Sequence, residues 1–253
     1  SAWSTNTHSH LVVNTTDKRL EFDLRDNGTD EVIQHDMGSS AGSISNTEWV
    51  LRCEITFTTW NGQENDNNNV IHFGCFADQT PTGITPSGDA LMWGHYMRGN
   101  TSTDGFDTKL RSVNNGTDTI TESNNNPFSS TTAPNTPFYL ELKRVSADSL
   151  EFRCFSDSSY STQVGSTLTR STSSAVTALR YLTIQVQNEV FGGNGYTGYL
   201  KNLKFWNGVT TTSQDEKATL ITTAGTGWTH AASNAITSNK LQWEIEPNDE
   251  SYY

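Results

Sequence analysis

The chain has 253 residues, of which 33% are hydrophobic, 17% charged and 10% aromatic, with seven tryptophans. A disordered chain would lack these aromatic residues, so the composition predicts a folded β protein with a Thr- and Asn-rich exterior. The formal net charge of −12 and the lack of a basic stripe argue against nucleic acid and anionic membranes as partners. No apolar run approaches membrane-spanning length, so we expect no membrane insertion.

The first residues carry no signal-peptide pattern, and we expect that such a peptide has already been removed before Ser1. Four Asn-x-Ser/Thr sequons lie in turn-like sequence, at Asn14, Asn27, Asn100 and Asn115. Chance matches are expected in a chain this rich in Asn and Thr, so the sequons add only weak support for a secreted glycoprotein. We expect an extracellular location, or one at a cell or virion surface.

Alternation of apolar and polar residues predicts half-buried antiparallel strands along the chain. In chain order, the residues expected to face inward are Leu20, Phe22 and Leu24; Trp49, Leu51, Cys53, Ile55 and Phe57; Ile71, Phe73 and Cys75; Phe138, Leu140 and Leu142; Leu150, Phe152 and Cys154; Leu182, Ile184 and Val186; and Leu241, Trp243 and Ile245. Ala147 and Asp148 form the turn of a predicted hairpin between Phe138 and Cys154.

Helical periodicity is weak throughout, and the best candidate is a short piece after Ser213. Polar clusters predict loops at 62–69, 79–89, 99–107, 114–133 and 156–177. Close to a dozen strands with short spacing and no proline-rich linker predict one domain over residues 1–253. We expect an all-β jelly-roll sandwich of two antiparallel sheets.

Three cysteines cannot all pair within one chain. Cys53, Cys75 and Cys154 each occupy a core-facing position of a predicted strand. We therefore favour small buried side chains over a disulfide framework or a metal site, although one pair could bridge if its strands are neighbours.

A glycine-rich stretch, "FGGNG", ends at Gly195. A phosphate-binding loop needs a helix after its glycines, whereas the residues after Gly195 read as a strand. Leu200, Leu203 and Phe205 can share the core side only if a bulge near Lys201–Asn202 corrects the odd step between them.

The segment "GYTGYLKNLKFWNG" resembles the closing strand of the concanavalin A-like lectin/glucanase superfamily, especially laminin G-like modules. "TEWVLRCEITFTTW" with "NVIHFGCFAD" resembles the paired strands near the start of such modules, and "PFYLELKRVSADSLEFRCFSD" resembles their central hairpin. The resemblance covers residues 19–209 and implies a jelly-roll scaffold. It also implies sugar binding, often helped by Ca²⁺ in loops at the sandwich rim, but Lys201 and Asn202 stand where many members carry Asp.

The resemblance also implies polysaccharide cleavage as an alternative function, since glucanases of this superfamily carry paired carboxylates on one strand. The closest string is "WEIEPNDE", where Glu244 and Glu246 share a face but Pro247 cannot sit in a central strand. No nucleophile elbow occurs, and the cysteines read as buried. We therefore expect no catalysis and assign no catalytic residues.

A glycan site needs an aromatic platform and planar polar side chains beside it. Trp60 lies at outward parity near a strand end, Gln185 and Gln187 belong to an outward hydrogen-bonding row, and Trp206 has opposite parity to Phe205. Three more candidates come from "LMWGHYMRG", although Trp93 could equally belong to the core. The predicted glycan-binding residues are Trp60, Trp93, His95, Tyr96, Gln185, Gln187 and Trp206.

The polar loop "QENDNNN" offers oxygen ligands of the kind that Ca²⁺ prefers. We predict a calcium site at Asp66, Asn67 and Asn69 as the one cofactor, with a simple solvated loop as the alternative. His8 and His10 share a face of an extended segment, but two ligands alone do not make a metal site.

These features predict a non-catalytic extracellular module that binds a polysaccharide or a cell-surface glycan, in adhesion for example. Two alternatives remain open. The chain could be a structural subunit of a surface layer, filament or virion that self-associates through its strand edges. It could also be a polysaccharide-degrading enzyme of the same fold.

Overall fold

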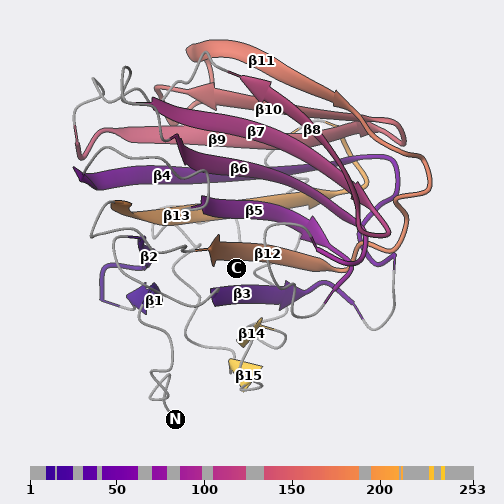
Figure 1. Cartoon of the computed structure of the whole chain (residues 1–253), viewed down its shortest axis with the longest axis horizontal. Coiled ribbons are helices and arrows are strands. Elements are labelled where there is room, and N and C mark those ends of the chain that lie inside the picture. The colour runs from indigo at the N-terminus through magenta and orange to yellow at the C-terminus, as the bar shows by residue number, and fades with distance from the viewer. Residues whose placement is uncertain are drawn as a thin grey trace.

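The strands pair into two sheets that pack as a sandwich (Figure 1). The computed structural model describes residues 10–14, 16–24, 31–38, 42–61, 70–78, 86–98, 105–123, 134–187, 195–210, 212, 228–230 and 235–236. Every strand pairing within these ranges is antiparallel. The predicted all-β jelly-roll sandwich of two antiparallel sheets is confirmed. None of the described residues belongs to a helix of the length and apolarity needed to span a membrane.

The seven-stranded sheet runs in the order β1 (Leu11–Asn14), β2 (Arg19–Asp23), β13 (Gly195–Asn207), β4 (Trp49–Asn61), β9 (Pro137–Ser146), β10 (Ser149–Phe155) and β11 (Gln163–Ser171). The eight-stranded sheet runs in the order β15 (Ala235–Ile236), β14 (Trp228–His230), β3 (Glu31–Asp36), β12 (Tyr181–Gln187), β5 (Val70–Phe76), β6 (Ala90–Arg98), β7 (Gly105–Asn114) and β8 (Thr117–Ser123).

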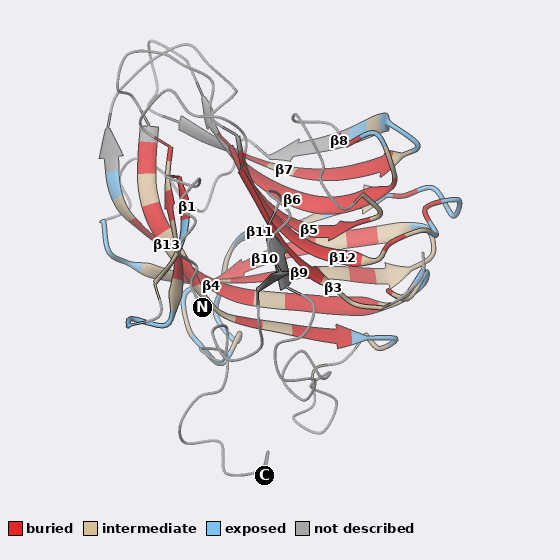
Figure 2. Ribbon diagram, turned by 90° about the horizontal axis from the view of Figure 1, so that it is seen from below, coloured by how far each residue is buried: buried red, intermediate tan, exposed pale blue. Residues whose placement is uncertain are grey.

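One continuous apolar cluster fills the space between the sheets. All the residues that the alternation directs inward belong to it, apart from Leu241, Trp243 and Ile245, which lie outside the described residues. Part of the outer face of the eight-stranded sheet is buried as well, in a second apolar cluster of Phe76, Ala90, Met92 and Val113. In β5 every residue from Val70 to Phe76 is buried (Figure 2), so this strand is not half-exposed as its alternation predicts.

The cysteines are free and buried, as the sequence predicts. Cys53 and Cys154 lie on either side of Leu140, with β9 between their strands, so they are not on neighbouring strands. Burial raises the pKa of all three thiols, which keeps them protonated and unreactive.

The predicted bulge in the closing strand is confirmed. The pairing of β13 with β4 shifts between Lys201 and Lys204, and Asn202 takes a left-handed φ of 54°. Leu200, Leu203 and Phe205 are each at most 2% exposed, because the extra residue returns all three to the core side.

Three of the predicted loops contain strand residues. β7 begins inside 99–107, β8 lies inside 114–133, and β11 lies inside 156–177. β8 and β11 carry many Ser and Thr residues, and β11 is an edge strand without a buried residue, so apolar alternation does not mark these two strands. β7 and β8 join through Asn115 and Gly116, both at positive φ, as a two-residue hairpin turn requires.

Candidate functional site

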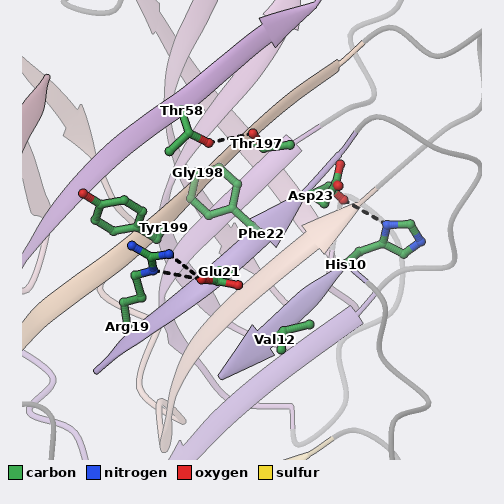
Figure 3. Close-up of a pocket in the computed structure, with 10 residues that line it drawn as sticks. All are labelled: His10, Val12, Arg19, Glu21, Phe22, Asp23, Thr58, Thr197, Gly198 and Tyr199. Atoms are coloured by element: carbon green, nitrogen blue, oxygen red, sulfur yellow. Dashed lines mark hydrogen bonds and ion pairs between the residues drawn. The ribbon is translucent and has the colours of Figure 1, made fainter. Parts of the chain in front are cut away.

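A groove lies on the outer face of the seven-stranded sheet, over β1, β2, β13 and β4 (Figure 3). Its volume is about 340 Å³. The lining residues are His10, Val12, Arg19, Glu21, Phe22, Asp23, Thr58, Thr197, Gly198 and Tyr199. Arg19, Glu21 and Asp23 occupy alternate positions of β2, so strand geometry directs all three side chains to this face.

One side of the groove holds an ion pair beside an aromatic ring. The Arg19 guanidinium lies 2.7 Å from a carboxylate oxygen of Glu21 and 4.6 Å from the ring centroid of Tyr199. Burial raises the pKa of Glu21, but hydrogen bonds from Asn14 and Arg19 outweigh this and leave the pKa below its ordinary value. Glu21 is therefore ionised at neutral pH and accepts hydrogen bonds.

The other side of the groove is lined by hydroxyl groups and a histidine. The Thr197 hydroxyl lies 2.7 Å from that of Thr58. Nδ1 of the His10 ring lies 2.9 Å from the backbone carbonyl oxygen of Asp23. The backbone N–H of His10 donates to both carboxylate oxygens of Glu31, which is 1% exposed. These hydrogen bonds link the residue before β1 to β3 of the other sheet.

The groove combines one aromatic ring, over one face of which the Arg19 guanidinium lies, with hydroxyl, carboxylate and imidazole groups. A pyranose ring can stack its C–H face on a tyrosine while planar polar groups hydrogen-bond to its hydroxyls. The volume lies at the small end of the range for ligand pockets, which suits one or two sugar rings of a longer chain.

Two predicted glycan-binding residues belong to the core instead. Trp93 and His95 are fully buried on the inward parity of β6. Trp93 stacks on Phe152 at 5.2 Å between ring centroids, and His95 packs against Phe57 at 4.8 Å. Neither has exposed surface on which a sugar could stack, so their assignment to a surface platform is corrected.

Trp206 lies on the outward parity of β13, as expected, but is only 2% exposed. Its ring lies 5.8 Å from the guanidinium of Arg52. Trp60 belongs to β4, and its side chain lies outside the described residues.

Strand register brings the remaining predicted residues together on the outer face of the eight-stranded sheet. Tyr96 and Gln187 both pair with Val70, one from each side, although their side chains are outside the described part. Gln185 pairs with His72 on the adjacent row. Arg111 of β7 approaches Nε2 of His72 at 3.4 Å, which completes a polar row of Arg111, His72 and Gln185.

This polar row is buried, since all three of its side chains are at most 1% exposed. Burial, followed by the charge of Arg111, holds the pKa of His72 well below its ordinary value. The polar row is therefore less accessible to a ligand than the groove is.

The predicted calcium ligands Asp66, Asn67 and Asn69 lie outside the described residues. Within the described part, no three His, Cys, Asp or Glu residues are grouped so as to hold a metal ion. Lys201 and Asn202, where the resemblance would place a ligand, both contact the carboxylate of Glu54, at 2.9 and 3.1 Å.

Sequence reasoning missed Arg19, Glu21 and Asp23. The alternation that directs Leu20 and Phe22 inward also places these charged residues outward, so the signal was present. Tyr199 and Thr197 carried no comparable signal. Only the pairing of β13 with β2 places Tyr199 opposite Glu21 and Thr197 opposite Asp23.

Comparison with known proteins places the fold. No protein-family model and no curated protein sequence matches the chain. The structure is similar to a legume lectin-like domain from Entamoeba histolytica, at 11% identity, covering 78% of this chain and 86% of that one, with a TM-score of 0.51. It is also similar to the exoplasmic/lumenal domain of VIP36 in its Ca²⁺/Man-bound form, at 8% identity, covering 80% and 82%, with a TM-score of 0.50.

A third similar structure is an alginate lyase from Pseudomonas aeruginosa, at 10% identity, covering 79% of this chain and 86% of that one, with a TM-score of 0.43. Similarity at these identities concerns the fold and leaves ligand and activity open. On the similarity to the legume lectin-like domain and to the VIP36 domain, together with the sheet topology, this chain has the concanavalin A-like lectin/glucanase fold.

Proposed function

We propose that this chain is a non-catalytic glycan-binding module that acts outside the cell or at a cell or virion surface. The groove beside Tyr199 carries the proposal, because it combines an aromatic face with hydrogen-bonding groups on an accessible part of the sheet. The similarity to a legume lectin-like domain and to a mannose-bound domain supports a carbohydrate as the ligand.

The state of the groove carboxylates supports binding without catalysis. Glu21 and Asp23 share one face of β2, and a carboxylate pair of this kind can cleave a glycosidic bond if one member donates a proton. A general acid of this kind needs a raised pKa, whereas the pKa of Glu21 is lowered. Glu21 is therefore suited to accept a hydrogen bond from a sugar hydroxyl.

Affinity electrophoresis against a panel of plant, marine and bacterial polysaccharides tests the proposal. We expect retardation by at least one glycan, and we expect Tyr199→Ala to weaken that binding about tenfold, because the stacking surface is lost. Thr197→Val should also weaken it. Thr169→Val is the matched control, since it removes an exposed hydroxyl from β11 on the same sheet, outside the groove.

Each other outcome of this assay changes the proposal in a defined way. Retardation that is lost in Gln185→Ala but kept in Tyr199→Ala would move the site to the polar row of the eight-stranded sheet. Shortening of the glycan would overturn the non-catalytic assignment. A chelator arm tests calcium at Asp66, Asn67 and Asn69. No retardation by any glycan would overturn the proposed function.

A further inference from the structure

A row of three side chains crosses the groove. Val12 of β1 pairs with Glu21 of β2, and Glu21 pairs with Tyr199 of β13. All three residues line the groove (Figure 3). Val12 is 41% exposed, more than any other large hydrophobic residue in the described part of the chain. The row therefore places one carboxylate between an accessible apolar side chain and an aromatic ring.

The Glu21 carboxylate is held through one of its two oxygen atoms. Oε1 accepts hydrogen bonds from Nδ2 of Asn14 and from Nε of Arg19, both at 2.9 Å. Nη2 of Arg19 lies 2.7 Å from the same oxygen. Oε2 makes no hydrogen bond or ion pair to any residue that the structure describes. Because the Glu21 side chain is 37% exposed, Oε2 is available to a ligand in the groove.

Asn14 uses all of its hydrogen-bonding capacity at this place. Its Oδ1 accepts hydrogen bonds from the backbone N–H groups of Thr16 and Asp17, at 3.1 and 2.9 Å. Its Nδ2 donates to Oδ2 of Asp17 at 3.0 Å, in addition to Glu21. Two N–H donors on one side and two carboxylates on the other leave no doubt which end of the amide carries the oxygen. The amide thus connects the backbone between β1 and β2 to the carboxylate in the groove.

The charge of Glu21 decides what a ligand must offer to it. Glu21 is ionised at neutral pH, and an ionised carboxylate only accepts hydrogen bonds. A free sugar hydroxyl can donate to Oε2, whereas an O-methylated position has no hydrogen to donate. The groove therefore distinguishes a free hydroxyl from a methyl ether at this point.

We propose that Asn14 is a positioning residue of the groove, which holds the Glu21 carboxylate so that Oε2 accepts a hydrogen bond from a free hydroxyl of the bound sugar ring. This proposal rests on the proposed function and names a specificity of the same site. Asn14 does not line the groove itself, so it acts through Glu21.

Asn14→Asp separates the two roles of this side chain. The aspartate keeps an oxygen for the backbone N–H groups of Thr16 and Asp17, but it has no donor for Glu21. Binding is measured by affinity electrophoresis and titration calorimetry with the polysaccharide panel, which includes mannan, dextran and galactan. We expect Asn14→Asp and Glu21→Gln each to weaken binding about fivefold or more. Thermal unfolding of each variant checks that the fold is intact.

A matched control comes from the other end of β13. Oδ1 of Asn207 accepts a hydrogen bond from the backbone N–H of Ser45 at 2.8 Å, and its Nδ2 donates to the carbonyl oxygen of Ser43 at 3.1 Å. Asn207→Asp therefore adds the same charge and removes the same kind of donor at a residue that does not line the groove. Binding by this variant should stay within about twofold of the unchanged protein.

Two further measurements separate positioning from a merely structural role. In a Glu21→Gln background, Asn14→Asp should weaken binding no further, because Asn14 acts through Glu21. Carbon-detected NMR of the free protein follows the titration of the Glu21 carboxyl. Although burial raises the pKa of Glu21, hydrogen bonds from Asn14 and Arg19 hold it below its ordinary value, so Asn14→Asp should raise this pKa.

Each panel polymer is also compared with its O-methylated form, and we expect methylation to weaken binding at least about tenfold. Equal binding of the two forms would overturn the part of the proposal that concerns the hydroxyl. If both Asn14→Asp and Asn207→Asp weakened binding equally, the added charge would explain the loss and Asn14 would have no special role.

Other results concern the positioning role directly. Unchanged binding by Asn14→Asp, or an unchanged pKa of Glu21 in that variant, would overturn the role of Asn14 while the proposed function stands. A further loss of binding in the Glu21→Gln background, together with a lower unfolding temperature, would make Asn14 a structural residue only. Absence of binding by every polysaccharide in the panel would overturn the proposed function, and this proposal with it.

Discussion

Gly198 shows how a single residue sets the shape of the groove floor. A Cβ atom placed on Gly198 would lie 2.2 Å from the carbonyl oxygen of Thr56 and 2.6 Å from Cζ of Phe22. Both distances are shorter than any normal contact, and the backbone oxygen cannot rotate away. The close approach of β13 to β4 beneath the groove therefore requires glycine at this position.

Gly198→Ala should destabilise the protein by about 2–3 kcal/mol, because backbone and the Phe22 ring must both shift. Chemical denaturation measures the change in the free energy of unfolding. Gly208→Ala is the control: its φ of 78° is strained for alanine, but no heavy atom of the described residues beyond its two chain neighbours lies within 4 Å of the added methyl group. It should cost only about 1 kcal/mol. Equal costs in the two variants would contradict the steric explanation.

At the scale of the element, the bulge in β13 decides which residues reach the core. Without the extra residue, Leu203 and Phe205 would point to the outer face, since a shift of one residue reverses every side chain of a strand. The left-handed Asn202 forms the bulge, and its amide donates to Glu54 at 3.1 Å. The same bulge places Lys204 opposite Arg52.

Asn202→Val should destabilise the protein by about 2 kcal/mol, because a β-branched residue at positive φ is strained and the hydrogen bond to Glu54 is lost. Asn202→Gly relieves the strain and should cost less than about 1 kcal/mol. Urea denaturation of the two variants gives the comparison. If valine and glycine were equally tolerated, the left-handed conformation at this position would be in doubt.

At the scale of the whole molecule, three buried histidines link stability to pH. Burial lowers the pKa of His35 to about 4 and that of His95 to about 3, from an ordinary value of 6.5. Burial, together with Arg111, also places the pKa of His72 well below 6.5. Because each folded-state pKa lies below the unfolded one, the unfolded chain binds protons first as the pH falls. The stabilisation is complete above about pH 6.5 and is lost below it.

We therefore expect the free energy of unfolding to fall between about pH 6.5 and about pH 5, by up to about 1.4 kcal/mol per pH unit for each histidine. Guanidinium denaturation at several pH values in this window measures the slope, before carboxylates begin to titrate. His95→Gln should lower overall stability but flatten the slope, because one proton-linked group is gone. A stability that stays constant over this window would contradict the burial of these rings.

The sequence by itself determined the sandwich and its core. Alternation at Trp49, Leu51 and Cys53 sets the inward face of β4, and the odd step before Leu203 predicted the bulge, because burial of one strand face is a local property with a period of two. The same alternation also places Gln185 on the outer face of β12. Alternation alone could not decide burial for Trp93 and His95, since either face of β6 could meet the core.

Only the tertiary structure decided the candidate site. The groove joins Glu21 of β2 to Tyr199 of β13, which are far apart in the chain. No single stretch of the linear sequence marks the groove, because its lining residues come from separate strands. The order and register of those strands, set by long-range pairing, bring these residues together, and local patterns do not encode that pairing.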